Sequence, residues 1–498
     1  MLEPMNSLDA GLLMMESPAT PMHIGGVQIL SIPRGEGSDY VRKVRQQVLK
    51  VPANAAPFNY KLASGAGPLG LPMWEVLPQV DLTEHVFHHA LPWPGGEREL
   101  FALVSRLNSG PLNRSKPLWE QHLIEGLSGR RWATFMRIHH ALMDGARGVE
   151  LTKQTTSRDA RTRNVPPYWG VRFGKPDAPS GRAGADEQGA DEPGPDWWER
   201  QGRLGREGFA TLAELRKAFG RLIESYRHPT DDGLKPLYVA PECMFNGKLT
   251  PRREVAVVQL DLERIKRLAQ ASEATVNEVV LAACSGALRR YLLARDALPD
   301  KPLVASMPIA MARTGAGAGG NAVIPGLVSL ATHIADPAER LQAVRGSSQH
   351  VKELYRDLAS QVALSIYLGV TGVPFLLAQI AGQPERVHAQ TLVISNVRGP
   401  GERRYVNGAE LLAAYPMSVL APGQGMNITV ISHGERLDVA VLVCPSLVPA
   451  PQEIADAIAA SVTELEHALA PRRRAARKSA QTTKTDRRGP RPNQRRSR

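Results

Sequence analysis

Hydrophobic and polar residues alternate along most of this chain with the two periods that indicate strands and helices. The segment Trp132–Ile138 has the period of two that is typical of a half-buried strand. In Glu97–Asn108, by contrast, Leu100, Leu103 and Leu107 form one stripe with helical spacing. Similar patterns predict further strands at Val27–Ser31, His122–Glu125, Glu254–Leu260, Leu303–Ala310, Ala322–Thr332, Thr391–Ser395, Asn427–His433 and Leu437–Val443. They predict further helices at Tyr40–Val51, Trp198–Tyr226, Leu262–Ser272, Thr275–Leu293, Pro337–Tyr355 and Ala450–Ala468.

Strands and helices follow one another in both halves of the chain, which predicts the α/β fold class with two α/β sandwiches. A length of 498 residues is too great for one ordinary core, so two domains are expected. Between them, a stretch rich in proline and glycine, Val165–Trp197, predicts a flexible connection. We therefore expect an N-terminal domain at 1–165, a linker at 166–200, a helical connection with a C-terminal domain at 201–468, and a tail at 469–498.

The net charge of +12 is concentrated at the C-terminus. Residues 471–498 hold twelve Lys or Arg and one Asp, which leaves about +1 for the other 470 residues. Such a basic, weakly hydrophobic tail is expected to be disordered. It suits an anionic lipid surface, and a passive role stays open. Because the body is nearly neutral, nucleic acid is not expected as a partner.

Cysteine usage and hydrophobic stretches bear on the cellular location. The three cysteines are scattered without a CxxC pair, which excludes a disulfide framework and suits a reducing cytosol. The N-terminal residues have neither the basic nor the apolar region of a secretory signal. The uncharged tract Leu358–Pro384 is interrupted by glycine and proline, so we expect a buried helix and a short surface helix there, either as ordinary core or as a monotopic membrane contact. The expected location is cytoplasmic, peripheral to the inner face of the membrane or to lipid inclusions.

The block HHALMDG at 139–145 holds the candidate chemistry. It follows the strand Trp132–Ile138 and precedes a segment, Gly145–Leu151, that is able to start a helix. Successive side chains on a strand point to opposite sides, so one histidine faces a cleft and the other packs. An imidazole there suits general base catalysis. Two other interpretations stay open: a metal site, although no third ligand is near, and two structural histidines with Asp144 capping a helix.

The ordered set of short motifs around this block resembles one family. HHxxxDG after a strand is the signature of the CoA-dependent acyltransferase superfamily, which includes chloramphenicol acetyltransferase and the condensation domains of peptide synthetases. The flanking motifs are similar to those of bacterial wax ester synthase/diacylglycerol acyltransferases. They are Asn6–Gly11, Glu16–Pro18, Pro21–Gly26, Pro117–Trp119, Phe245–Gly247, Thr275–Val279, Ser395–Asn396, Gly399–Pro400 and Asn427–Thr429. The chain departs from the family at Glu278, usually Asp, and at Val397–Arg398, usually Val-Pro.

The resemblance implies two chloramphenicol-acetyltransferase-like domains with the active site in a tunnel between them. It implies an O-acyltransferase that moves an acyl group from acyl-CoA to diacylglycerol or a long-chain alcohol, with acyl-CoA as substrate and no cofactor or metal. His140 is then the base, His139 a supporting residue and Asp144 a structural one, held by an ion pair, while Gly145 gives the backbone room. The resemblance also implies candidate substrate-binding residues: Glu16, Trp119, Asn277, Ser395 and Asn396. Arg313, just before the glycine-rich loop at 315–320, is a further candidate for a contact with CoA or the oxyanion.

Some of these assignments have alternatives. Asn277 also fits the first turn of a helix that Thr275 and Glu278 cap, and Trp119 also fits a core position. The loop Gly315–Gly320 matches GxGxxG, but it precedes a strand rather than a helix, so no dinucleotide site is expected. Two other functions stay possible at this point: a condensation-type acyltransferase that uses a carrier-protein thioester, and a non-catalytic lipid-surface protein of the same fold.

Overall fold

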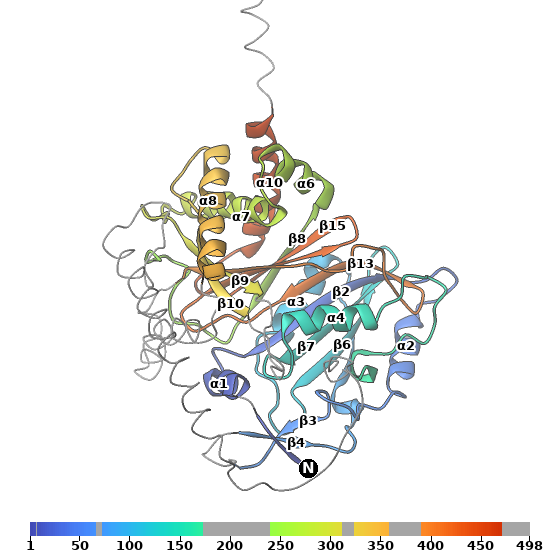
Figure 1. The fold of residues 1–498 in the computed structure, drawn as a ribbon. Coiled ribbons are helices and arrows are strands. Elements are labelled where there is room, and N and C mark those ends of the chain that lie inside the picture. Colours follow the sequence, from blue (N-terminus) through green and yellow to red (C-terminus); the bar gives the residue numbers. More distant parts are fainter. Residues whose placement is uncertain (6, 66–71, 173–239, 311–322, 358–389, 471–498) are drawn as a thin grey trace, which may run out of the picture.

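Two six-stranded sheets, each covered by helices, make up the protein (Figure 1). The structure is a computed structural model that describes residues 1–5, 7–65, 72–172, 240–310, 323–357 and 390–470. A smaller sheet of three strands lies beside the N-terminus, with the order β1 (Leu2–Pro4), β4 (Met73–Val76) and β3 (Tyr60–Leu62). This two-sheet architecture confirms the predicted fold class.

The first sheet has the hairpin of β6 and β7 at its centre. Its strand order is β12 (Tyr405–Val406), β13 (Ala409–Met417), β2 (His23–Ser31), β7 (Arg131–His139), β6 (Trp119–Leu127) and β5 (Val86–Ala90). Among the neighbouring strands, β5 and β6 run parallel to each other, and all the other pairs are antiparallel. Four helices accompany the sheet: α1 (Ser7–Met15), α2 (Tyr40–Val48), α3 (Glu97–Leu107) and α4 (Gly145–Gln154). The predicted hairpin and the predicted helices at 40–51 and 97–108 are thereby confirmed.

The second sheet has its helices gathered on one face, at the top of Figure 1. Its strand order is β10 (Val323–Ser329), β9 (Val304–Ala310), β11 (Leu392–Val397), β14 (Met426–His433), β15 (Arg436–Val443) and β8 (Glu254–Asp261). The helices are α6 (Leu262–Ala271), α7 (Val276–Leu293), α8 (Pro337–Asp357) and α10 (Pro451–Leu469). Thr275 and Glu278 form the predicted capping box at the start of α7.

One strand departs from a division into two consecutive halves. β13 comes from the C-terminal part of the chain, yet it pairs with β2 in the first sheet. A register shift between Leu411 and Ala413 bends it. From the second sheet, the Asp438 carboxylate accepts a hydrogen bond from the N–H of Ala414 at 2.7 Å. The crossing strand therefore joins the two sheets, and a domain that ends at residue 165 lacks it.

The two sheets share an apolar cluster, which fixes the faces that they turn toward each other. In β8 and β15 the side chains of Val257 and Ala440 pack in this cluster together with residues of the first sheet and α3. The first-sheet members include Val27, Ile29, Ala133, Phe135, Ala413 and Tyr415. The opposite face of the second sheet packs its own helices in a separate core. β8 and β15 thus have one side toward the helices and one toward the first sheet.

The beginning of the predicted linker belongs to the first domain. Trp169 is buried, its ring stacks on Trp119 at a centroid distance of 5.2 Å, and its indole N–H donates to the carbonyl of Val51 at 2.9 Å. The prediction of a flexible connection was therefore wrong for residues 166–171, because Trp169 packs in the core of the first domain. Other predictions fall outside the described residues: the rest of the linker, the helix 198–226, Arg313 with the loop 315–320, the tract 358–384 and the tail from 471.

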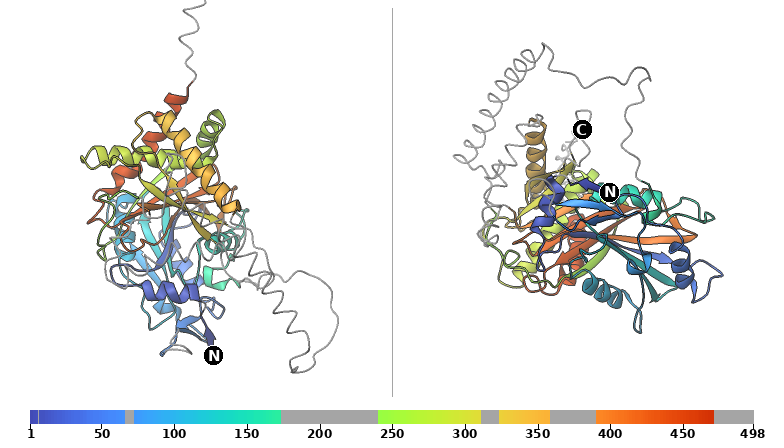
Figure 2. Two further views of the ribbon diagram at one scale, coloured as in Figure 1. Left: turned by 60° about the vertical axis from the view of Figure 1, so that its left-hand side comes forward. Right: turned by 90° about the horizontal axis from the view of Figure 1, so that it is seen from below.

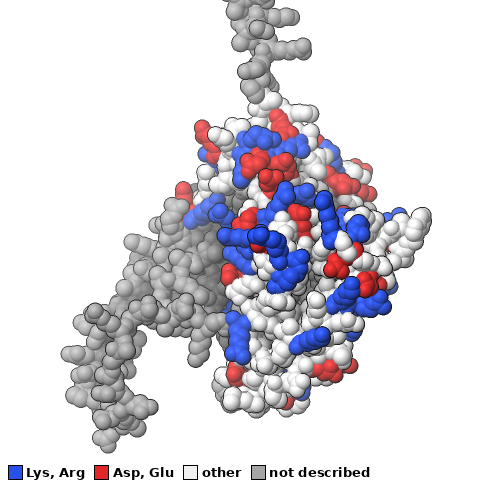
Figure 3. Space-filling view, turned by 90° about the vertical axis from the view of Figure 1, so that its right-hand side faces the viewer, with Lys and Arg blue, Asp and Glu red and all other residues white. Residues whose placement is uncertain are grey.

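Basic and acidic side chains are interspersed on the face of the molecule in Figure 3. This agrees with a nearly neutral body. Figure 2 shows the helices from two further sides. Within the described ranges, none of them has the length and hydropathy needed to cross a membrane.

Candidate active site

His139 is the last residue of β7, and its side chain is wholly buried. Its Nδ1 accepts a hydrogen bond from the backbone N–H of Ala141 at 3.1 Å, so this nitrogen carries no proton. Its Nε2 lies 3.5 Å from Oε1 of Glu16, facing the carboxylate without a hydrogen bond. His139 is the histidine that packs, and its geometry suits support rather than proton transfer with a substrate.

His140 occupies the turn after β7 and is only partly buried. Its backbone N–H donates to the carbonyl of Met22 at 2.8 Å, which fixes the backbone of the turn. Burial lowers the pKa of its imidazole below the ordinary 6.5, while a hydrogen bond to its own backbone carbonyl and the nearby Asp144 carboxylate raise it in part. The imidazole is therefore mainly neutral at pH 7 and able to accept a proton.

Asp144 caps the helix that follows the histidines. Its carboxylate accepts a hydrogen bond from the N–H of Arg147 at 2.8 Å, the usual arrangement at an N-cap. This agrees with a structural role, whereas the predicted ion pair stays a prediction. The steric reason expected for Gly145 was wrong, since a Cβ at that position would meet no described atom within 4 Å.

Glu16 is directed inward, although the resemblance suggested substrate binding. Its carboxylate accepts hydrogen bonds from the N–H of Met22 at 3.1 Å and from Nε and NH2 of Arg114 at 3.2 and 2.9 Å, and it faces His139. Only 3% of its side chain is exposed. Burial raises the pKa of this carboxyl, but the contacts with His139, Met22 and Arg114 outweigh burial and lower it to about 2. Glu16 is thus an anion that joins the two histidines to the segment before β2.

Two predicted residues of the second domain meet, although 119 positions separate them. The Nδ2 of Asn396 in β11 donates to Oδ1 of Asn277 at 3.2 Å, and Nδ2 of Asn277 donates to Sδ of Met307 at 2.8 Å. Beside them, Glu278 accepts from Nζ of Lys352 at 2.9 Å in addition to its capping bond. The glutamate that departs from the family pattern therefore has a complete set of partners.

Ser395 points to the other face of the second sheet. In β11 it pairs with Thr429 of β14, which pairs with Ala440 of β15, so the three side chains share one face. Ala440 belongs to the cluster that contacts the first domain. Asn396 has the opposite orientation, toward α7. Of these two neighbours, only Ser395 faces the side where a site between the domains is predicted, and the tunnel itself stays a prediction.

Trp119 lies in the core of the first domain. It is fully buried, its ring stacks with His85 at 4.4 Å, and its indole N–H donates to the carbonyl of Phe58 at 2.8 Å. These contacts agree with the alternative of a core position. Its predicted role in substrate binding is untested, and Arg313 lies outside the described residues.

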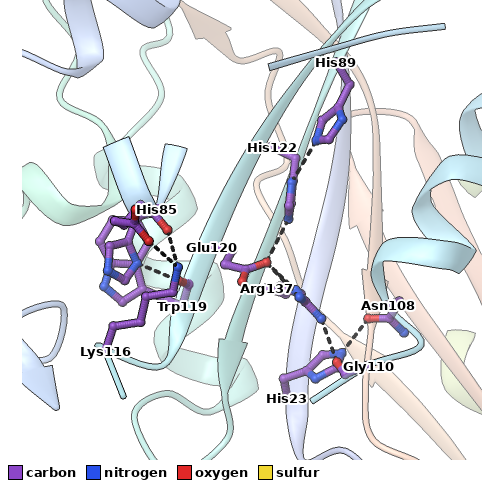
Figure 4. A network of polar contacts seen from close by, with 11 residues as sticks. His23, His85, His89, Asn108, Gly110, Lys116, Trp119, Glu120, His122 and Arg137 are labelled. Carbon is purple, nitrogen blue, oxygen red and sulfur yellow. Dashed lines mark hydrogen bonds and ion pairs between the residues drawn. The ribbon is translucent and has the colours of Figure 1, made fainter. Parts of the chain in front are cut away.

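Sequence reasoning missed a polar network on the same hairpin (Figure 4). The carboxylate of Glu120 in β6 accepts from Nε and NH2 of Arg137 in β7 at 2.9 and 2.7 Å. Nε2 of His122 lies 3.3 Å from the same carboxylate, and its Nδ1 lies 3.1 Å from Nε2 of His89. Arg137 precedes His139 by two residues and shares its face of the strand, so the network stiffens the histidine strand. The signal for it was the charged pair within an otherwise buried hairpin.

No group of three or more His, Cys, Asp or Glu in the described part of the chain has a geometry able to hold a metal ion. The metal interpretation of the histidine pair gains no support from these residues.

Family models match most of the chain. The description "Wax ester synthase/diacylglycerol acyltransferase catalytic domain" matches residues 5–280, and "WS/DGAT C-terminal domain" matches residues 319–466. A probable diacylglycerol O-acyltransferase of Mycobacterium tuberculosis is 34% identical over 463 residues, which is 93% of this chain and 98% of that protein. The O-acyltransferase WSD of Acinetobacter baylyi is 33% identical over 460 residues, 91% of this chain and 94% of that protein.

Solved structures agree. The wax ester synthase/diacylglycerol acyltransferase from Marinobacter aquaeolei VT8 superposes with a TM-score of 0.71 and 30% identity, covering 94% of this chain and 100% of that one. A condensation domain of the calcium-dependent antibiotic synthetase superposes with a TM-score of 0.55 at 17% identity, covering 95% and 97% of the two chains. The second likeness concerns the fold alone.

Proposed function

Because the chain belongs to the wax ester synthase/diacylglycerol acyltransferase family and is an acyltransferase, we propose that it transfers a long-chain acyl group from acyl-CoA to the hydroxyl of diacylglycerol or of a long-chain alcohol. The products are triacylglycerol or wax ester, together with free CoA. The observation that carries the proposal is the place of His140, a partly buried imidazole in the turn after the histidine strand, whose backbone is fixed by the carbonyl of Met22 and whose pKa burial lowers below 6.5.

In the proposed mechanism His140 acts first as base and then as acid. The acceptor oxygen attacks the thioester carbonyl carbon while its proton passes to the imidazole of His140. The tetrahedral oxyanion then collapses, the C–S bond breaks, and the imidazolium gives its proton to the departing CoA sulfur. General base catalysis of this kind contributes roughly 10²–10⁴-fold. The lowered pKa serves both steps, because the base is neutral at pH 7 and its conjugate acid gives up the proton readily.

The second domain is proposed to supply the polar side of the site. Ser395 lies on the sheet face that Ala440 turns toward the first domain, so its hydroxyl is the candidate donor to the oxyanion, which hydrogen bonds stabilise most where water is excluded. Asn396 and Asn277 hold each other on the helix side of the sheet, so we assign them the placing of β11 against α7 rather than contact with the thioester.

We also propose that the protein works at a lipid surface, with its acceptor drawn from that lipid. Diacylglycerols and long-chain alcohols dissolve in membranes or lipid inclusions rather than in water. The tail, with a charge of +11 over residues 471–498, suits attraction to anionic lipid on the cytoplasmic side.

A direct assay tests the activity. Purified protein is given labelled palmitoyl-CoA with diacylglycerol or hexadecanol in separate reactions, and labelled neutral lipid and free CoA are measured together. We expect ester formation with at least one acceptor, in equal amount to the CoA released, and its loss in His140→Ala. CoA release without ester would identify a thioesterase, and no turnover with either acceptor would refute the proposed function.

A further inference from the structure

Arg253, just before β8, is a buried cation whose side-chain hydrogen bonds, within the described residues, all go to backbone carbonyls. It is 3% exposed. Its NH1 donates to the carbonyls of Thr250 and Arg252 at 2.5 and 3.0 Å, and its NH2 donates to the carbonyl of Ala19 at 2.6 Å. The described residues offer it no carboxylate. A buried guanidinium without an anion is costly, and well-packed apolar residues often hold protein layers together at least as well.

Ala19 lies in the segment Glu16–Met22, here called the strap, which connects α1 to β2. The strap is closed by backbone hydrogen bonds between Ser17 and Thr20 in both directions, at 3.3 and 3.0 Å. At its ends, the Glu16 carboxylate accepts from the N–H of Met22. The carbonyl of Met22 then accepts from the N–H of His140 at 2.8 Å. A short chain of bonds thus runs from an arginine of the second domain to the backbone of the proposed base.

A second route connects the same place to the histidine strand. The backbone N–H of Arg253 donates to Oγ of Ser109 at 2.9 Å, at the end of α3. The neighbouring Asn108, which is the C-cap residue of α3, bonds Nε2 of His23 through its Oδ1 at 2.9 Å (Figure 4). His23 lies directly opposite His139 in the pairing of β2 with β7. This second route starts from the backbone of Arg253 and ends opposite His139, whereas the route from its side chain ends at the backbone of His140.

From these contacts we propose that Arg253 is a positioning residue that holds the strap against the second domain and so aligns His140 with substrates bound between the domains. This inference rests on the proposed function. If Arg253 acts in this way, the same contacts determine both the spacing between the two domains and the orientation of the His140 side chain. Without Arg253 the chain still folds, but the turn that carries His140 is free to shift. A misplacement of about 1 Å in such a group costs on the order of 10²-fold in rate.

The test compares Arg253→Met with a matched control, Arg340→Met. Arg340 is also 3% exposed and donates through NH1 to two backbone carbonyls, of Ile334 and Ala335, at 2.9 and 3.1 Å, but it lies on α8 away from the strap. Tm, kcat and KM for acyl-CoA are measured for both. We expect a similar fall in Tm, a loss in kcat of at least roughly 10-fold for Arg253→Met alone, and an unchanged KM for acyl-CoA. Arg253→Lys, which retains one donor toward the strap, should recover part of kcat.

Combination with Glu16→Gln identifies the route. If both residues act through the strap, the double variant should lose little more kcat than the worse single variant, whereas Arg340→Met with Glu16→Gln should give the product of the two losses. Equal effects of Arg253→Met and Arg340→Met on kcat, or independent losses in the Arg253 pair, would overturn the inference. A wild-type protein without transferase activity would instead refute the proposed function, so the two failures are distinguishable.

Discussion

Replacement of Glu16 by glutamine tests how the Glu16 carboxylate supports the histidine pair. The substitution keeps the size of the side chain but removes the charge that faces His139 and Arg114. The pKa of this carboxyl falls from 4.5 to about 2, because its bonds outweigh the cost of burial. This difference corresponds to roughly 3 kcal/mol of folding free energy. The Arg114 side chain is 46% exposed and water screens its charge, so we take about 2 kcal/mol as the stabilisation.

The dependence on pH follows from the direction of this shift. A carboxyl with a lowered pKa in the folded state stabilises the protein above pH 4.5, and that stabilisation is lost as the pH falls toward 2. For a chain of this size, with roughly 2 cal/mol/K of unfolding entropy per residue, Glu16→Gln should lower Tm by about 2 °C at pH 7. The gap to the wild type should narrow to roughly half near pH 3. Scanning calorimetry across this range measures it.

A matched control separates charge burial from charge alone. Glu84 also faces a cation, Lys116 at 3.3 Å, but 65% of its side chain is exposed. Glu84→Gln should change stability by less than about 0.5 kcal/mol at every pH. Activity is measured in parallel, and Glu16→Gln should lower kcat because the Met22 contact beneath His140 is weakened. A Tm for Glu16→Gln equal to the wild type at pH 7, or a gap that stays constant down to pH 3, would refute this reasoning.

Four further predictions concern the histidine turn and the tail. His140→Ala should lose at least about 10²-fold in activity with its fold intact, and His139→Ala should lose less; mild and equal losses would remove the base from His140. Because burial lowers the pKa of His140, kcat/KM should decline only below pH 6.5, and a midpoint above that value would contradict the assignment. Asp144→Ala should lower the free energy of unfolding by about 1 kcal/mol, because the helix cap is lost. It should also move the decline of kcat/KM to lower pH, because the Asp144 carboxylate raises the pKa of His140. A loss of rate with an unchanged Tm would instead indicate that Asp144 takes part directly in the chemistry. Truncation after Ala470 should leave turnover of soluble short-chain substrates unchanged and weaken binding to anionic vesicles, with a difference that shrinks as salt rises; tighter, salt-sensitive binding to RNA than to vesicles would contradict the lipid role.

Strands, helices and turns were predicted well where they depend on residues that are close together in the sequence. The hairpin with histidines at its end follows from period-two alternation around a glycine turn, and the start of α7 follows from Thr275 and Glu278 three residues apart. The alternation of side chains along a strand also places Ser395 and Asn396 on opposite faces of β11. It does not extend to His140, which lies in the turn after β7.

The sequence alone did not predict contacts between residues that are far apart in the chain. The alternating burial of β13 is visible in its sequence, yet nothing local states that its partner is β2, almost 400 positions earlier. The inward direction of Glu16 depends on Arg114 and His139, which come from distant segments. Likewise, the contact of Asn277 with Asn396 needs the packing of α7 on the second sheet. Motifs indicated which residues matter, whereas the tertiary contacts decide whether a residue faces substrate or supports a neighbour.

The crossing of β13 has a consequence for biosynthesis. As the ribosome releases the chain, β2 and β7 emerge early, but the strand that covers the outer side of β2 is completed only at Met417. Until then β2 is a free edge with unpaired backbone groups, able to pair with another chain. The sheet of the first domain is therefore completed only after most of the second domain has been synthesised. Slow translation beyond residue 165 should favour aggregation of the nascent chain.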